Sequence, residues 1–113
     1  MSRNNLEDEL AKYILVVPSA PHDGQDADYN SWYDDHHLGE LCSIPGVISG
    51  KRFDAAPESP HTPDLPYLAL YEIETDDPSS VFAEIGRRSA SGEMTPSTAV
   101  NAETARLWLY KAH

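Results

Sequence analysis

Residues 67–74 read YLALYEIE, and this stretch decides the fold of the chain. It is apolar at both alternating sets of positions as far as Glu72, which predicts a strand covered on both faces. Two further segments are also apolar on both faces and are predicted to be strands: residues 12–17 (KYILVV) and 105–111 (ARLWLYK). A fourth strand is predicted at residues 47–53 (VISGKRF), after the Ile-Pro-Gly turn at 44–46. Pro18 is expected to end the first of them.

Two helices are predicted between these strands. The first begins at an aspartate cap, Asp26 or Asp28, and runs to about Ser43. The second begins where Asp77 precedes Pro78, since an acidic cap followed by proline is a common helix start. Its apolar stripe consists of Val81, Phe82 and Ile85.

The resulting order, β-α-β-β-α-β, predicts an α+β, ferredoxin-like domain with a four-stranded antiparallel sheet and two helices on one face. We expect residues 1–11 to be a flexible leader and residues 12–113 to form this single domain. The proline-rich segment 54–66 and the segment 91–103 are predicted loops and candidate lids over a pocket.

Composition narrows the classes of partner. The 113 residues include 19 acidic and 8 basic side chains, a net charge of −11, which argues against nucleic acid and anionic membranes as partners. No apolar run approaches the ~18 residues of a membrane span, and the first ten residues lack a signal-peptide pattern. Cys42 stands alone, so no internal disulfide is expected and a reducing cytoplasm is predicted.

The strands carry apolar residues on both faces, but the two helices can cover only one face. Ile14 and Val16, for example, alternate with Leu15. The uncovered set would exceed the few hundred Å² that soluble monomers usually expose. We therefore expect a symmetric homodimer that packs sheet against sheet. The alternative is that the last strand or the leader folds over the sheet.

Residues 30–41, NSWYDDHHLGEL, are the segment that suggests chemistry. At ~100° per residue, one stripe of the first helix faces the sheet. It contains Tyr29, Tyr33, His37, Glu40, Leu41 and Ile44, with His36 at its shoulder. His37 and Glu40 would cost several kcal/mol if buried without partners, so they either pair with neighbours or line a cavity between helix and sheet.

Two interpretations of His37 stay open at this point. In the structural one it is a satisfied core histidine, with Glu40 paired to Arg52 and Trp32 as a packing anchor. In the catalytic one it is a general acid/base oriented by Glu40 or Asp34, because an imidazole titrates near pH ~6.5. Tyr33 or Tyr71 would then donate a hydrogen bond to a developing oxyanion.

Arg52 also has two interpretations, since strand alternation sends it and Lys51 to opposite faces. It either anchors a substrate carboxylate or phenolate, or pairs with Glu40 or Glu72. No metal site is expected, because His36 and His37 point ~100° apart on a helix. Cys42 lies across the helix from His37, so a Cys–His nucleophile is not expected, and no glycine-rich phosphate motif suggests a nucleotide or flavin.

The pattern N-x-W-Y-D-x-x-H-x-x-E at residues 30–40, followed by Ile44-Pro45-Gly46, resembles the EthD-like branch of the dimeric α+β barrel proteins. The resemblance covers roughly residues 12–110. It implies ferredoxin-like monomers that pair sheet to sheet, and it carries His37 over as a catalytic or pocket-lining residue. The chain departs from the pattern at His36, where relatives often have an acidic residue, and at Gly39, where proline is common.

Together these observations predict a cofactor-independent enzyme of lyase or isomerase type that acts by acid/base catalysis on a small aromatic or cyclic carbonyl compound. The expected catalytic residues are His37, Glu40, His36 and Asp34. The expected substrate-binding residues are Trp32, Tyr33, Arg52 and Tyr71. The alternatives are a cofactor-free monooxygenase on the same scaffold and a non-catalytic protein that binds a hydrophobic metabolite.

Overall fold

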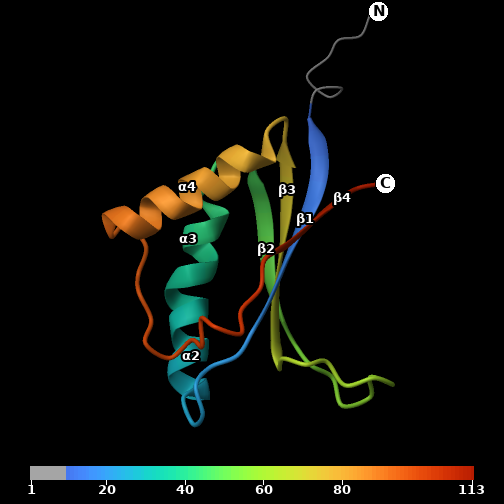
Figure 1. Cartoon of the computed structure of the whole chain (residues 1–113), viewed down its shortest axis with the longest axis vertical. Coiled ribbons are helices and arrows are strands. Elements are labelled where there is room, and N and C mark those ends of the chain that lie inside the picture. Colours follow the sequence, from blue (N-terminus) through green and yellow to red (C-terminus); the bar gives the residue numbers. More distant parts are fainter. Residues whose placement is uncertain (1–9) are drawn as a thin grey trace, which may run out of the picture.

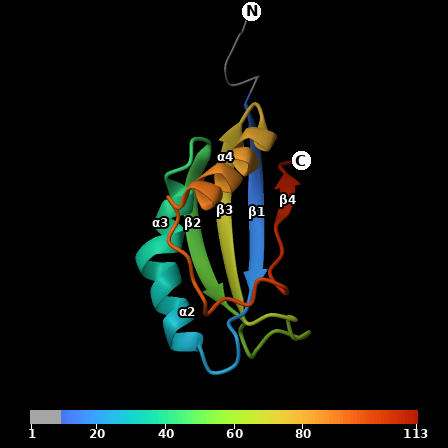
Figure 2. The ribbon, with the colours of Figure 1, turned by 60° about the vertical axis from the view of Figure 1, so that its left-hand side comes forward.

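Four antiparallel strands form one sheet in the order β2-β3-β1-β4, and all helical segments lie on the same face of it (Figures 1 and 2). The structure, a computed structural model, describes residues 10–113. Its elements are β1 (Ala11–Ser19), α2 (Asp26–Trp32), η1 (Tyr33–His37), α3 (Leu38–Cys42), β2 (Val47–Asp54), β3 (Tyr67–Thr75), α4 (Pro78–Ser91) and β4 (Trp108–Lys111). The predicted α+β, ferredoxin-like fold is confirmed.

The core lies between the helices and one face of the sheet. Its largest fully buried side chains come from both layers: Tyr29, Ile44, Tyr71, Ile73 and Val81. Phe82 and Ile85 pack against this core half-buried, as the predicted stripe of α4 requires. None of the helices in residues 10–113 combines the length and the apolar character that a membrane crossing needs.

The first helix is interrupted by a π-turn, η1, which the sequence analysis did not predict. The N–H of Leu38 donates to the carbonyl of Tyr33, five residues back. In an uninterrupted α-helix, Leu41 would lie about 120° around the axis from Tyr29. The extra residue in the π-turn rotates the following residues back by about 100°, which keeps Leu41 and Ile44 on the buried face.

The helix starts agree with the predictions only for α4. There, the Asp77 side chain accepts a hydrogen bond from the N–H of Ser79, with Pro78 at the first helical position. The first helix instead has Gln25 at its N-cap, without a side-chain cap. The aspartates at 26 and 28 lie inside its first turn, where their charge is favourable next to the positive end of the helix dipole.

Strands β1 and β4 differ from the predicted bounds for a shared reason. β1 begins at Ala11, inside the predicted leader, and continues through Pro18, while β4 begins only at Trp108. The N–H of Arg106 donates to the Pro18 carbonyl, so the missing N–H of Pro18 also faces the β4 side. The proline therefore leaves the pairing with β3 intact and stops the β4 ladder instead. The rest of the predicted leader, residues 1–9, lies outside the described residues.

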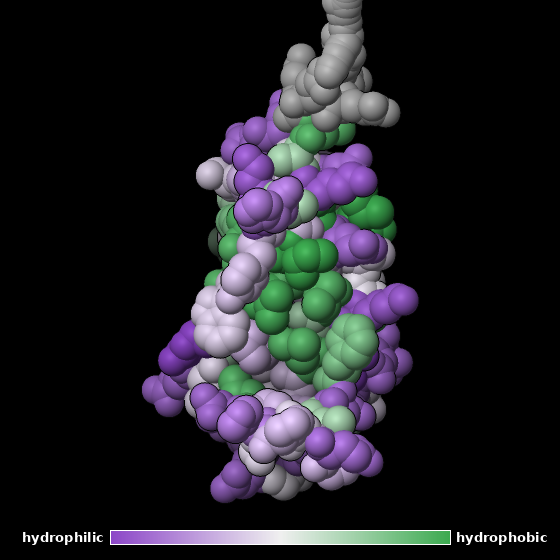
Figure 3. Space-filling view, turned by 90° about the vertical axis from the view of Figure 1, so that its right-hand side faces the viewer, coloured by the Kyte–Doolittle hydropathy of each residue, from purple (hydrophilic) through white to green (hydrophobic). Residues whose placement is uncertain are grey.

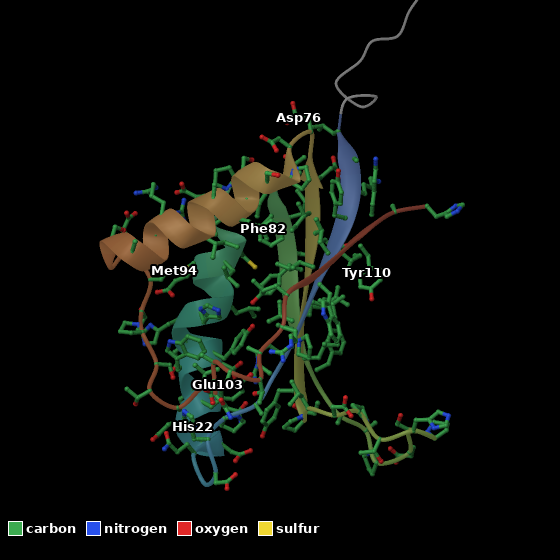
Figure 4. The ribbon with its side chains drawn as sticks, viewed as in Figure 1. His22, Asp76, Phe82, Met94, Glu103 and Tyr110 are labelled. Carbon is green, nitrogen blue, oxygen red and sulfur yellow. The ribbon has the colours of Figure 1, made fainter. Side chains whose placement is uncertain are left out.

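The sheet face away from the helices is apolar at its centre and charged around it (Figure 3). Its exposed large side chains are Ile48, Phe53, Trp108 and Tyr110, and half-buried Ile14, Val16, Leu68 and Leu70 lie between them. We call these eight residues the open-face patch. Tyr110 points away from the helices in Figure 4, and the register pairs it with Ile14.

Gly50 in β2 is a position where the packing requires glycine. A Cβ there would lie 2.8 Å from Cδ1 of Tyr71 and 2.9 Å from Sγ of Cys42. We expect Gly50→Ala to lower the free energy of unfolding by about 1–3 kcal/mol, measured by urea denaturation, because the core must shift to admit the methyl group. The matched control is Gly86→Ala in α4, where a Cβ has no neighbour within 4 Å. It should raise stability by about 0.5–1 kcal/mol, and a neutral Gly50→Ala would contradict the argument.

Candidate functional site

His37, at the end of η1, is packed between two aromatic rings. Its imidazole stacks on Trp32, with ring centroids 4.3 Å apart, and meets the ring of Tyr33 edge-on at 4.9 Å. Nδ1 of His37 is the one side-chain nitrogen or oxygen in residues 10–113 that is buried without a hydrogen-bond partner. Because buried polar atoms are nearly always paired, this nitrogen marks a candidate site.

A cavity of about 230 Å³ lies beside this imidazole. It is lined by Trp32, His37, Ser89, Met94, Thr95 and Pro96. Met94 lies beside α3 and below the end of α4, on the opposite side of the helix layer from Tyr110 (Figure 4). This cavity is not the predicted hollow between helix and sheet, where the rings of Tyr29, Tyr33 and Tyr71 are buried. The cavity lies instead between the first helix and the segment that follows α4.

Thr95 connects that segment to the first helix. Its backbone N–H lies 3.1 and 3.2 Å from the two carboxylate oxygens of Glu40, and its hydroxyl donates to Glu40 at 2.6 Å. Its carbonyl accepts a hydrogen bond from Nε1 of Trp32 at 2.8 Å. The predicted pair between Glu40 and Arg52 does not form, since the carboxylate of Glu40 is bound to Thr95.

The electrostatics of the site favour a neutral histidine. Burial lowers the pKa of His37 below its ordinary value of 6.5, and the negative charge of Glu40 opposes this only in part. A neutral imidazole carries one nitrogen with a free lone pair. His37 is therefore able to accept a proton at neutral pH.

Arg52 lies on the helix side of the sheet, opposite Ala69 in β3. Its guanidinium donates to Asp34 at 2.8 Å and to Asn30 at 2.7 Å. It also sits over the rings of Tyr29, Tyr33 and Tyr67, with 4.6 Å to the centroid of Tyr33. Burial opposes its charge, but the hydrogen bond and the negative charge of Asp34, together with Tyr29, outweigh this and raise the pKa of Arg52. Neither predicted partner is found: Glu40 binds Thr95, and Glu72, on the opposite face, accepts from Ser49.

The hydroxyls of Tyr33 and Tyr71 form a buried pair, 3.0 Å apart. Burial raises the pKa of Tyr33 to about 12 and that of Tyr71 above its ordinary value. Both phenols therefore stay protonated at neutral pH. This pair links β3 to the first helix, and the ring of Tyr33 joins it to the imidazole of His37.

The predicted residues thus form a row rather than one cluster. Trp32, His37 and Tyr33 are in direct contact, and Tyr71 joins them through Tyr33. Arg52, which is paired with Asp34, lies over the Tyr33 ring and does not line the cavity. His36 is exposed and makes no hydrogen bond within the described chain. Within residues 10–113, no group of three His, Cys, Asp or Glu side chains is arranged to hold a metal ion.

The cavity residues contributed by the end of α4 and the segment after it were not predicted from the sequence: Ser89, Met94, Thr95 and Pro96. The local sequence pattern carries no signal for them, since Thr95 contacts Glu40 across 55 positions of the chain. The available indication was that three of them, residues 94–96, lie in the predicted lid loop 91–103.

A larger cavity, of about 590 Å³, lies apart from His37 at the end of the open face. It is lined by the proline-rich segment and by side chains of β2, β3 and β4, among them Phe53, Leu68 and Trp108. Figure 1 shows this segment projecting on the side of the sheet that the helices leave uncovered.

Comparison with solved structures finds the same fold in several bacterial proteins. A proposed monooxygenase from Shewanella loihica PV-4 superposes with a TM-score of 0.60 and 14% identity, over 92% of this chain and 96% of that one. An ethyl tert-butyl ether D (EthD) family protein from Bacillus halodurans gives a TM-score of 0.58 and 21% identity, over 91% and 99%. An EthD-like protein from Ralstonia eutropha gives 0.55 and 14%, over 88% and 90%.

These likenesses are structural. No protein-family model matches the sequence, and no curated protein matches it significantly. The chain therefore has the EthD-like fold that the resemblance at residues 30–46 predicted.

Proposed function

We propose that the chain is a cofactor-independent enzyme in which His37 moves a proton on a small aromatic or cyclic carbonyl compound bound in the adjacent cavity. Two observations carry this proposal: His37 lines that cavity, and its Nδ1 is buried without a hydrogen-bond partner. A structural histidine in a packed core would have a hydrogen-bond partner on this nitrogen.

The surroundings suit a general base. The stacked ring of Trp32 fixes the plane of the imidazole, and burial keeps it neutral until it takes a proton. The charge of Glu40 then stabilises the imidazolium that forms. Ser89 supplies the hydroxyl for a developing oxyanion, because its present contact, with Sδ of Met94 at 3.5 Å, is a weak one.

The size of the cavity limits the substrate. At about 230 Å³ it is smaller than the ~300–1,000 Å³ typical of sites for drug-sized ligands. A compound of about one ring fits this space. This supports the isomerisation, dehydration or ring closure of a small carbonyl compound.

The test is the exchange of α-protons in D₂O, followed by ¹H NMR over a panel of cyclic 1,3-diketones and hydroxyaryl ketones. We expect exchange to be catalysed, and its rate to be constant above about pH 6.5 because His37 is then neutral. The rate should fall as the pH drops below 6.5, toward the lowered pKa of His37. An acid limb centred above pH 6.5 would contradict the assignment of the base.

Two other functions have an observation in their favour. The Shewanella structure is described as a proposed monooxygenase, which supports oxygen chemistry on this scaffold. The cavity of about 590 Å³ supports the binding of a hydrophobic metabolite without turnover. Oxygen consumption with the same panel identifies the first, and tight binding that persists in a His37→Phe variant identifies the second.

We also propose that the protein is a homodimer joined through the open-face patch. Trp108 and Tyr110, in the edge strand β4, are 49% and 60% exposed in the single chain, on a face that no helix covers. Lys51 and Glu72 lie on the same face, so a two-fold axis can bring opposite charges together around the apolar centre.

A further inference from the structure

One wall of the His37 cavity is a loop segment, Met94 to Pro96, which we call the 94–96 wall. In residues 10–113, Met94 and Pro96 make no backbone hydrogen bond that would hold this wall in place. Thr95 makes all of the wall's polar bonds to the first helix, with its N–H and hydroxyl bound to Glu40 and its carbonyl to Trp32.

The two partners of Thr95 flank His37 in the sequence and have different functions. Glu40 binds the donor groups of Thr95 with a carboxylate, and bonds of this charge-assisted kind are roughly twice as strong as neutral ones. Trp32 binds the Thr95 carbonyl through its indole N–H while its ring stacks on the imidazole. The same tryptophan therefore ties the position of the wall to the orientation of His37.

We propose that Thr95 is a latch: Glu40 and Trp32 hold it against the first helix and so set the width of the His37 cavity. In this arrangement Glu40 is a positioning residue that acts through Thr95. Glu40 is not bonded directly to the imidazole, whereas the sequence suggested that it orients His37. The proposal deepens the proposed function, and it rests on that function only for the identity of the site.

The latch predicts the chemical accessibility of His37, which can be measured without a substrate. Diethyl pyrocarbonate acylates neutral imidazoles, and peptide mass spectrometry resolves the rate at each histidine. In the wild-type protein we expect His37 to react at least tenfold more slowly than the exposed His36. Thr95→Val and Glu40→Gln should each raise the rate at His37 by about tenfold and leave the rate at His36 unchanged.

Matched controls come from the same elements. Thr98→Val changes an exposed threonine three residues along the loop, and Asp35→Asn an exposed carboxylate of the same helix. Neither side chain makes a hydrogen bond in the described structure. Both should leave the rate at His37 at the wild-type value. Thr95→Val removes only one hydroxyl, so it remains informative if the Glu40 variant fails to fold.

The outcomes separate the latch from the proposed function. A wild-type rate at His37 in both folded latch variants would overturn the latch, whatever the enzyme does. A raised rate at His37 in both, with both controls unchanged, supports the latch. If the same protein keeps its full turnover after loss of the His37 imidazole, that result overturns the proposed function and leaves the latch standing.

Discussion

Replacing His37 with phenylalanine is expected to lower kcat for α-proton exchange by about 10²–10⁴-fold, the usual contribution of a general base. Phenylalanine retains a ring that can stack on Trp32 but has no nitrogen to accept the proton. Initial rates by ¹H NMR at pH 7.5 give the measurement. The matched variant at the exposed neighbour, His36→Phe, tests which of the two histidines acts. It should change kcat by less than about threefold. Full activity in a folded His37→Phe protein would remove His37 from the mechanism.

The same variant also tests whether His37 is buried in its neutral form, because such a group makes the free energy of unfolding depend on pH. The pKa of His37 is depressed in the folded chain, so its contribution to stability is complete above pH 6.5, the value for the unfolded state. It is lost as the pH falls from there through the folded-state pKa. Urea unfolding at pH 7 and pH 5 should therefore show a smaller loss of stability in His37→Phe than in the wild-type protein.

An aspartate in place of Trp108 is expected to dissociate the proposed homodimer, with the dissociation constant rising by at least about 10³-fold. Trp108 pairs with Val16 on the open-face patch, and a two-fold axis that joins two copies of this patch would bury two new carboxylates without partners. Each would cost several kcal/mol in such a setting. Sedimentation equilibrium measures the change directly.

Leu107→Asp is the matched control for Trp108→Asp. Leu107 is 56% exposed, but it precedes β4, and alternation directs it away from the open face. It should leave the dissociation constant within about threefold of the wild-type value. A wild-type protein that sediments as a monomer at micromolar concentration would overturn the dimer itself.

The fold could be predicted because its signals are local. The apolar runs at β1 and β3, the Asp77–Pro78 start of α4 and the buried face of the first helix all follow from neighbouring residues. The shortening of β4 could not be read in this way. It arises because Pro18 faces β4 rather than β3, a fact that depends on strand order and register.

The candidate site was less predictable, because its pairings are settled by packing between distant segments. The spacing of Glu40 allowed it to orient His37 or to pair with Arg52. In the structure its carboxylate binds Thr95 instead. Arg52 had two candidate acidic partners, and the register of β2 places it beside Asp34. Helical spacing identified His37 on the buried side, but the cavity beside it is made by a loop that has no periodicity to read.

The π-turn at residues 33–37 has a consequence for how this scaffold can evolve. Deleting one residue there would restore regular α-helical hydrogen bonds. Tyr29, Tyr33, Leu41 and Ile44 would then stay on the helix face that packs against the core. The packing of the hydrophobic core therefore does not require the extra residue of the π-turn. Its effect falls on the side chains that the widened turn presents, His36 and His37. If His37 acts as proposed, descendants that lose the proposed activity would be free to delete the extra residue, whereas those that retain it would keep the insertion.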